Sequence, residues 1–230
     1  MGWRTDRLLR AAKMRLEHVA YRAGLMSKKD VERLREYWHD PSDDANQPER
    51  YAEHPDRSKF LIERIDELAT RPSSILEVGC NVGRNLHFLR EAGFAPLTGV
   101  ELSGKALETL RRVYPGLADA VTLLHAPAEE ALRPLAADSF DLVFSMAVLV
   151  HIPPPGSDEV FTQMARVARR NIVTIEDETL HTERHFPRDY ERIFSRLGLR
   201  QIAVFDGATM AKRDFTTDYV ARVFEKPAAR

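Results

Sequence analysis

From Ser73 onward, short apolar runs alternate with stretches whose apolar residues recur at helical spacing. Strands separated by helices predict a parallel sheet that is covered by helices on both faces. The predicted strands are ILEVG from Ile75, PLTGVEL from Pro96, VTLLHA from Val121, FDLVFSMAVL from Phe140, NIVTIED from Asn171, LRQIAVFD from Leu199 and DYVARVFEK from Asp218. The helices predicted between them lie near residues 84–92, 105–113, 129, 158–168 and 188–197.

The last two predicted strands are joined by a short link, residues 207–214. A parallel connection needs a longer crossover, so these strands are expected to form an antiparallel hairpin. The predicted fold class is therefore α/β: a doubly wound, mostly parallel seven-stranded sheet with an antiparallel C-terminal hairpin.

A different pattern precedes this region. Residues 8–25 place Leu8, Ala12, Leu16, Val19 and Ala23 on one helical stripe, and a second helix is predicted from Ser27, a good N-cap, to Trp38. A polar, proline-marked segment follows, and then a helix from Arg57 to Thr70. We expect a helical N-terminal appendage, residues 1–58, before the main domain, residues 59–230.

Composition narrows the class of protein. The 230 residues are 43% hydrophobic and 30% charged, which is typical of a globular chain, and the net charge of −1 gives no reason to expect a polyanionic partner. Cys80 is the single cysteine, so no internal disulfide is possible. Because no apolar run could cross a bilayer or serve as a signal-peptide core, a cytoplasmic location is expected.

Glycines mark the junction between the first predicted strand and its helix, in ILEVGCNVGRN. Gly79 and Gly83 suit a turn that lets a ligand approach the backbone. Glu101 ends the next strand, where a carboxylate can accept hydrogen bonds from both hydroxyls of a ribose. These features suit NAD or another adenosine ligand. The dinucleotide fingerprint G-x-G-x-x-G is missing, however, and Glu77 before the loop would repel a pyrophosphate.

The segment from Ile75 to Asn85 resembles motif I of the class I S-adenosylmethionine (SAM) methyltransferases. GVELS with Glu101, HAPAEE and DSFDLVFSMAVLVHIP follow in the family's order. Asn81 departs from the family's usual glycine, but asparagine tolerates left-handed backbone. The resemblance implies SAM as cofactor, with these contacts: Glu77, Gly79, Cys80, Asn81, Gly83 and Asn85 around the methionine moiety, Glu101 and Leu102 at the ribose, Ala128 and Glu129 at the adenine, and Ser145 and Met146 near the methyl group.

In an open parallel sheet the reacting groups lie beyond the carboxyl ends of the strands. His151, after the fourth strand, is a candidate general base, although similar enzymes often carry a histidine-isoleucine-proline turn that only packs against the cofactor. His181 and His185 are expected to line the acceptor pocket. The alternative, a metal site shared by these two histidines, is less favoured, and no metal is predicted.

By the same resemblance, the N-terminal appendage is expected to form a lid, and Tyr51 or Arg57 could contact the SAM carboxylate. Residues 1–29 carry eight basic and two acidic side chains. This basic helix could pack as an ordinary helix, attract an anionic acceptor or contact an anionic membrane surface.

These observations predict methyl transfer from SAM to an oxygen or nitrogen of a small molecule, with a biosynthetic or sugar-related metabolite as the acceptor that the resemblance suggests. The asparagine-proline-proline-aromatic signature of DNA amino methyltransferases is absent after the fourth strand, which argues against a nucleic-acid acceptor. Two alternatives stay open: a SAM-binding regulatory or scaffold protein without turnover, and an NAD-linked oxidoreductase. The sequence does not predict an oligomeric state.

Overall fold

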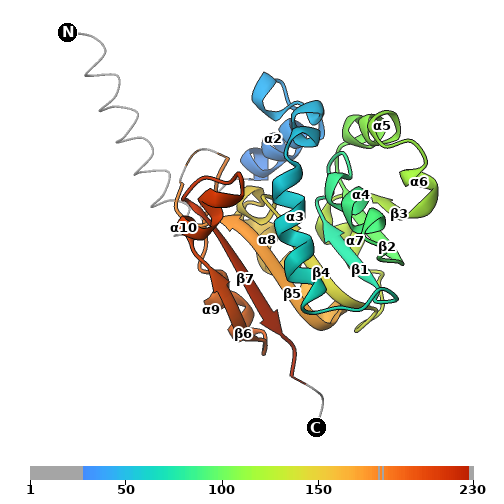
Figure 1. Cartoon of the computed structure of the whole chain (residues 1–230). Helices are drawn as coiled ribbons and strands as arrows, with labels where there is room; N and C mark the ends of the chain where they lie inside the picture. Colours follow the sequence, from blue (N-terminus) through green and yellow to red (C-terminus); the bar gives the residue numbers. More distant parts are fainter. Residues whose placement is uncertain (1–27, 181, 183, 228–230) are drawn as a thin grey trace.

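The computed structural model describes residues 28–180, 182 and 184–227 (Figure 1). Its centre is a seven-stranded sheet with the strand order β3-β2-β1-β4-β5-β7-β6. Every adjacent pair is parallel except those made by β7, which runs antiparallel to both β5 and β6. The strands are β1 (Ile75–Val78), β2 (Leu97–Glu101), β3 (Thr122–His125), β4 (Phe140–Met146), β5 (Ala168–Asp177), β6 (Arg200–Phe205) and β7 (Tyr219–Glu225). The predicted fold class and hairpin are confirmed.

Helices cover both faces of the sheet. One hydrophobic cluster joins α3, α4 and α5 to one face, and a second joins α7, α8 and α9 to the other. The helices are α2 (Lys28–His39), α3 (Pro55–Asp66), α4 (Arg84–Glu91), α5 (Gly104–Val113), α6 (Leu117–Ala120), α7 (Ala128–Leu132), α8 (Pro154–Val167), α9 (Tyr190–Arg196) and α10 (Gly207–Met210), with 3-10 helices η1 (Asp44–Asn46), η2 (Pro48–Glu53), η3 (Leu149–His151) and η4 (Ala211–Arg213).

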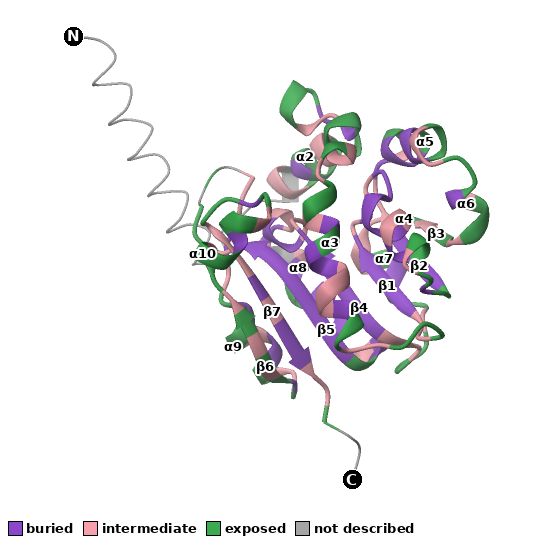
Figure 2. Ribbon diagram, in the orientation of Figure 1, coloured by how far each residue is buried: buried purple, intermediate pink, exposed green. Residues whose placement is uncertain are grey.

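Burial explains why the central strands read as continuous apolar runs. All four residues of β1 are buried, because neighbouring residues of a strand point to opposite faces and both faces are covered (Figure 2). Ile75 packs in the first cluster and Leu76 in the second. The edge strand β6, by contrast, alternates between exposed and half-buried positions.

Several element boundaries differ from the predictions. The helix expected from Arg57 begins at Pro55, and the one expected from Asp158 begins at Pro154, because proline is favoured in the first helical turn. The segment 40–57 contains the two short helices η1 and η2, and the link 207–214 contains α10 and η4. The predicted helix 8–25 and the N-cap Ser27 lie outside the described residues.

The register places the carboxyl ends of three strands together. Val78 pairs with Val100 of β2 and with Ser145 of β4, so the loops after β1, β2 and β4 leave the sheet at the same edge. In the part of the chain that the structure describes, no helix has the length and apolar character needed to cross a membrane.

Candidate functional site

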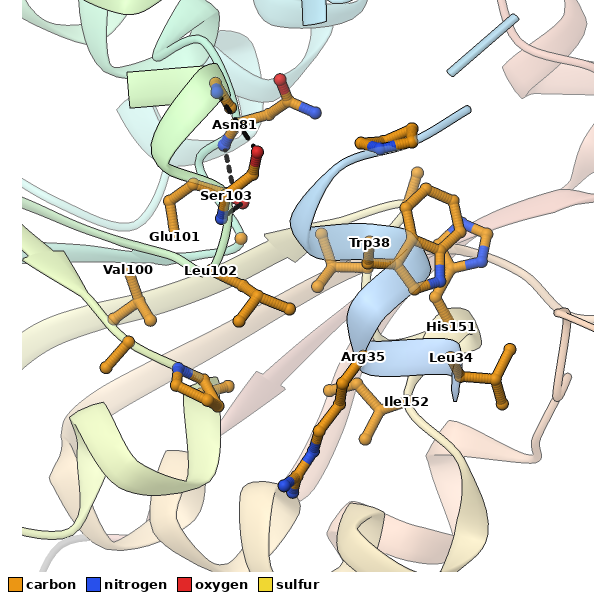
Figure 3. A pocket seen from close by; sticks show the side chains of 18 of the residues that line it. Leu34, Arg35, Trp38, Asn81, Val100, Glu101, Leu102, Ser103, His151 and Ile152 are labelled. Atoms are coloured by element: carbon orange, nitrogen blue, oxygen red, sulfur yellow. Dashed lines mark hydrogen bonds between the residues drawn. The ribbon is translucent and has the colours of Figure 1, made fainter. Parts of the chain in front are cut away.

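A cavity lies at this edge of the sheet, between the strand ends and α2 (Figure 3). It encloses about 1150 Å³, its open mouth included, which is enough for a small-molecule ligand. Its walls come from α2 and the segment after it (Val31, Leu34, Arg35, Trp38, Pro41, Asn46, Pro48, Tyr51), from the loops after β1 and β2 (Gly79, Asn81, Glu101, Leu102, Ser103), from the loop after β3 (Ala126, Pro127, Ala128, Glu129), and from the end of β4 with the turn beyond it (Met146, Ala147, Val148, His151, Ile152, Pro153).

The loop after β1 needs unusual backbone conformations. Gly79, Asn81 and Gly83 all have positive φ, of 77°, 47° and 72°. A Cβ atom on Gly79 would lie 2.6 Å from Val148 Cγ1, so this position also needs a residue without a side chain. The left-handed conformation expected for Asn81 is confirmed, and asparagine is among the residues that adopt it most readily.

The Glu101 carboxylate holds this loop in place. One of its oxygens accepts a hydrogen bond from the Asn81 amide at 2.8 Å, and the other accepts one from the Ser103 amide at 2.7 Å (Figure 3). Burial raises the pKa of Glu101, and these N–H groups lower it in part. Since each carboxylate oxygen can accept two hydrogen bonds, Glu101 can still accept two from a ligand diol.

A buried polar network lies beneath the loop. Glu77 Oε1 accepts a hydrogen bond from Asn85 Nδ2 at 2.6 Å, and Asn85 Oδ1 accepts one from Ser58 Oγ at 2.7 Å. Glu77 Oε2 is buried and has no hydrogen-bond partner. Burial raises the pKa of Glu77 to about 8, so this carboxyl group is mostly protonated at neutral pH.

The turn after β4 presents His151 to the cavity. Its Nδ1 lies 2.9 Å from the carbonyl oxygen of Arg184. Because a carbonyl can only accept, Nδ1 carries the hydrogen and Nε2 keeps a free electron pair. Burial lowers the pKa of His151 to about 3; the hydrogen bond to the Arg184 carbonyl raises it in part, and the charges of His185 and Arg184 lower it. The imidazole is therefore neutral at working pH.

Aromatic rings surround this imidazole. The Trp38 ring of α2 lies over His151 at a centroid distance of 4.2 Å (Figure 3), and the His185 ring lies at 4.7 Å. His185 therefore contacts the candidate base, although it does not line the cavity. His181 lies outside the described residues. Among the residues that the structure describes, no three His, Cys, Asp or Glu side chains are grouped as a metal site would require.

The other predicted contacts fall into two groups. Residues that line the cavity are Tyr51, Gly79, Asn81, Glu101, Leu102, Ala128, Glu129, Met146 and His151. Residues that do not are Arg57, Glu77, Cys80, Gly83, Asn85 and Ser145. Arg57 instead donates to the backbone oxygen of Asp214 at 2.7 Å, and Ser145 donates to Glu176. Cys80 is buried, and a Cβ atom on Gly99 would lie 2.7 Å from its sulfur, so Cys80 packs against β2.

The N-terminal appendage was expected to form a lid, but none of the α2 residues that line the cavity was predicted to do so. Val31, Leu34 and Trp38 lie at helical spacing and all line the cavity, while Arg35 forms an ion pair with Glu129 across it. The Ser103 hydroxyl also donates to the carbonyl oxygen of His39 at 2.8 Å. The helical spacing of the apolar residues was a usable signal, but its partner surface could not be identified without the fold.

Comparisons with known proteins agree with this geometry. Residues 75–171 match the family model described as a methyltransferase domain. The chain is 36% identical to methyltransferase GfsG of Streptomyces halstedii over 138 residues, which are 58% of this chain and 45% of that protein. It is 37% identical to the ubiquinone biosynthesis O-methyltransferase of Aromatoleum aromaticum over 83 residues, 36% of this chain and 35% of that one.

The chain thus spans less than half the length of these curated relatives. Among solved structures, magnesium protoporphyrin IX methyltransferase from Synechocystis with bound SAM superposes with a TM-score of 0.65 at 15% identity, covering 87% of this chain and 99% of that one. At this identity the likeness concerns the fold. The strand order and this superposition show a class I methyltransferase fold, and residues 75–171 within it match the methyltransferase-domain model.

Proposed function

We propose that this protein transfers the methyl group of SAM to a hydroxyl oxygen of a small, largely apolar molecule. The observation that carries the proposal is that one cavity is lined by both Glu101 and His151. Glu101 can accept hydrogen bonds from a diol, and His151 can accept a proton. The proposal includes a division of the chain into a lid, residues 1–58, and a SAM-binding domain, residues 59–230.

The residues present fit SAM. Glu101 has electron pairs left for the two ribose hydroxyls, and Asn81 Oδ1 is buried without a hydrogen-bond donor. Ala128 and Glu129 line the cavity beyond Glu101, where the resemblance puts the adenine. When bound, SAM supplies a methyl group already activated by its sulfonium, so the protein's own task is alignment and removal of the acceptor's proton.

His151 is suited to that proton transfer. The Arg184 carbonyl fixes the hydrogen on Nδ1, and Nε2 is left to accept the proton of an acceptor hydroxyl. The low pKa of about 3 keeps the imidazole unprotonated before the reaction, and it also makes His151 a weaker base than an ordinary histidine. A positioned base of this kind typically contributes about 10²–10⁴-fold to a rate.

The wall next to His151 favours an apolar acceptor. Val31, Leu34 and Trp38 of α2 face the cavity together with Ile152 and Pro153. Arg35, the charged side chain of α2 in this wall, is already paired with Glu129. An aromatic or aliphatic hydroxyl therefore fits better than a sugar, and an O-methyltransferase among the relatives supports oxygen as the methylated atom.

The test is an activity assay with the purified chain, SAM and a panel of phenols that includes catechol. Formation of S-adenosylhomocysteine and of the methylated product would be followed by mass spectrometry. We expect His151→Ala to slow turnover at least tenfold, while the dissociation constant for SAM changes less than about threefold, in keeping with the loss of one general base.

His87→Ala is the matched control, because His87 stacks on Tyr114 and does not line the cavity. Loss of SAM binding in His151→Ala would make His151 a packing residue. SAM binding by the wild type without turnover of any panel member would favour the alternative, a SAM-binding protein that acts as a regulatory or scaffold partner.

A further inference from the structure

The turn that carries His151, defined as residues 148–152, has its backbone polar groups satisfied from two sides. On the N–H side, the amides of Val148, Leu149 and Val150 all donate to the carboxylate of Glu176. On the C=O side, Arg188 donates to the carbonyl oxygens of Leu149 and Ile152.

Glu176 is fully buried near the end of β5. Its Oε2 lies 3.1 Å from the amide of Val148 and 3.2 Å from that of Val150, and its Oε1 lies 3.2 Å from the amide of Leu149. The Ser145 hydroxyl also donates to Oε1. A buried carboxylate is costly unless its oxygens are hydrogen-bonded, and here four donors converge on it. An apolar residue would suit the strand better, so the carboxylate points to a role in shaping the turn.

Arg188 completes the arrangement. Its Nη1 lies 2.8 Å from the carbonyl oxygen of Leu149 and 2.8 Å from that of Phe186, and its Nη2 donates to Ile152. The Phe186 amide donates to the carbonyl oxygen of Val150 at 2.6 Å. The Arg184 carbonyl oxygen also accepts from His151 Nδ1. Residues 184, 186 and 188 thus all form hydrogen bonds with the turn.

Both side chains bind the short helix of the turn, η3, which is formed by residues 149–151. The N–H groups of Leu149 and Val150 donate to Glu176, and the Leu149 carbonyl oxygen, which also accepts from the Ile152 N–H, accepts from Arg188. Neither Glu176 nor Arg188 lines the cavity, so neither is placed to touch the acceptor.

From this geometry we propose that Glu176 and Arg188 are positioning residues, a two-sided clamp that fixes the His151 imidazole for proton transfer. The proposal rests on the proposed function, because it gives His151 a proton to accept. Its structural part, the orientation of the imidazole, can be measured without an acceptor.

The variants are Glu176→Gln, which keeps the shape but replaces an acceptor oxygen by an N–H donor, and Arg188→Lys, which keeps the charge but loses the fork of two nitrogens. Arg192→Gln, at an exposed position of α9, is the control. Imidazole ¹⁵N NMR chemical shifts would be recorded for each folded variant. The signals of His151 would be assigned as those that are missing from the spectrum of His151→Ala. Dissociation constants for SAM, and kcat and KM for the best phenol of the panel, would be measured alongside.

We expect the wild type and Arg192→Gln to show the neutral Nδ1–H form of His151. Glu176→Gln and Arg188→Lys should show a mixture of the two neutral forms, with kcat at least tenfold lower and SAM affinity within about threefold of wild type, because a misplaced base lowers the rate of the chemical step.

An unchanged Nδ1–H form with kcat within twofold of wild type in both variants would overturn the proposal. So would a loss of SAM affinity that parallels the loss of turnover, which would indicate a purely structural role. If Glu176→Gln does not fold, Arg188→Lys decides between these outcomes. If the wild type methylates no panel member, the proposed function fails while the clamp is still judged by the ¹⁵N shifts.

Discussion

At the scale of single residues, two carboxyl groups near the ends of β1 and β2, the buried Glu77 and the half-buried Glu101, serve different purposes. Glu101 lines the cavity and accepts one hydrogen bond each from the amides of Asn81 and Ser103. Its remaining electron pairs can bind a diol. Glu77 lies beneath the loop, pairs with Asn85 and leaves one oxygen without a partner. The first is therefore expected to act mainly in binding, and the second to make stability depend on pH.

We predict that Glu101→Ala weakens SAM binding by about 10²–10⁴-fold, since two hydrogen bonds are lost and each hydrogen bond to a charged acceptor is worth about 1.5–3 kcal/mol. Calorimetric titration of the variant with S-adenosylhomocysteine measures this directly. Glu108→Ala, at an exposed position of α5, is the control and should bind as the wild type does. An affinity of Glu101→Ala within threefold of wild type would remove Glu101 from the ribose site.

Glu77 gives a prediction about pH. Its pKa is about 8 in the folded protein against an ordinary 4.5, so between these values the folded state holds a proton that the unfolded state has released. Its contribution to stability is therefore fully present below about pH 4.5 and is lost as the pH rises towards 8. Glu77→Gln has no proton to lose.

The free energy of unfolding of Glu77→Gln should thus rise relative to wild type by up to about 1.4 kcal/mol per pH unit across this window. Urea unfolding at pH 5.5, 7 and 8.5 without SAM would show the trend, with Glu108→Gln as the exposed control. A difference from wild type that stays constant with pH would show that Glu77 is ionised in the folded protein.

At the scale of elements, the glycine loop and the turn after β4 depend on each other. Gly79 has a positive φ and lies against Val148, the first residue of the turn that carries His151. Gly116 also has a positive φ, of 79°, but nothing lies within 4 Å of the position where its Cβ would be. Substituting the two glycines in turn therefore distinguishes the free-energy cost of a left-handed backbone from the additional cost of a steric clash.

We expect Gly116→Ala to lower the free energy of unfolding by about 1 kcal/mol, from the left-handed backbone alone, and to leave SAM binding unchanged. Gly79→Ala adds the clash with Val148, so it should destabilise the protein further and weaken SAM binding at least tenfold. Thermal unfolding and calorimetric titration of both variants test this. Equal effects of the two substitutions on SAM binding would show that the contact between the loop and the turn is unimportant.

The elements also show what the sequence can and cannot predict. The strands and the glycine loop were predictable because two-sided burial and tight turns leave local signals, such as the apolar run before Gly79. The individual contacts of α2 were not predictable, although a lid was expected, because Arg35 and Glu129 are 94 residues apart and neither residue reveals the other. The bonds of Glu176 and Arg188 to the turn after β4 were not predictable either, since they depend on where that turn comes to lie.

At the scale of the whole molecule, the strand order explains where the cavity forms. The chain runs outward from β1 through β2 to β3 and then crosses back to β4 on the other side of β1. The chain therefore passes from β1 to α4 on one face of the sheet and from β4 to α8 on the other, which opens a crevice at the shared strand edge, the usual ligand site in sheets of this kind. Helix α2 covers this crevice and is held by the Arg35–Glu129 ion pair and the hydrogen bond from Ser103 to His39.

The measurement that tests the proposed function most directly is a calorimetric titration of the purified chain with S-adenosylhomocysteine and, in parallel, with NAD. The cavity around Glu101 and Asn81 predicts saturable binding of S-adenosylhomocysteine and no binding of NAD, because the loop lacks the glycine spacing that a pyrophosphate needs. Saturable binding of NAD, with no heat from S-adenosylhomocysteine, would contradict the assignment and favour an oxidoreductase.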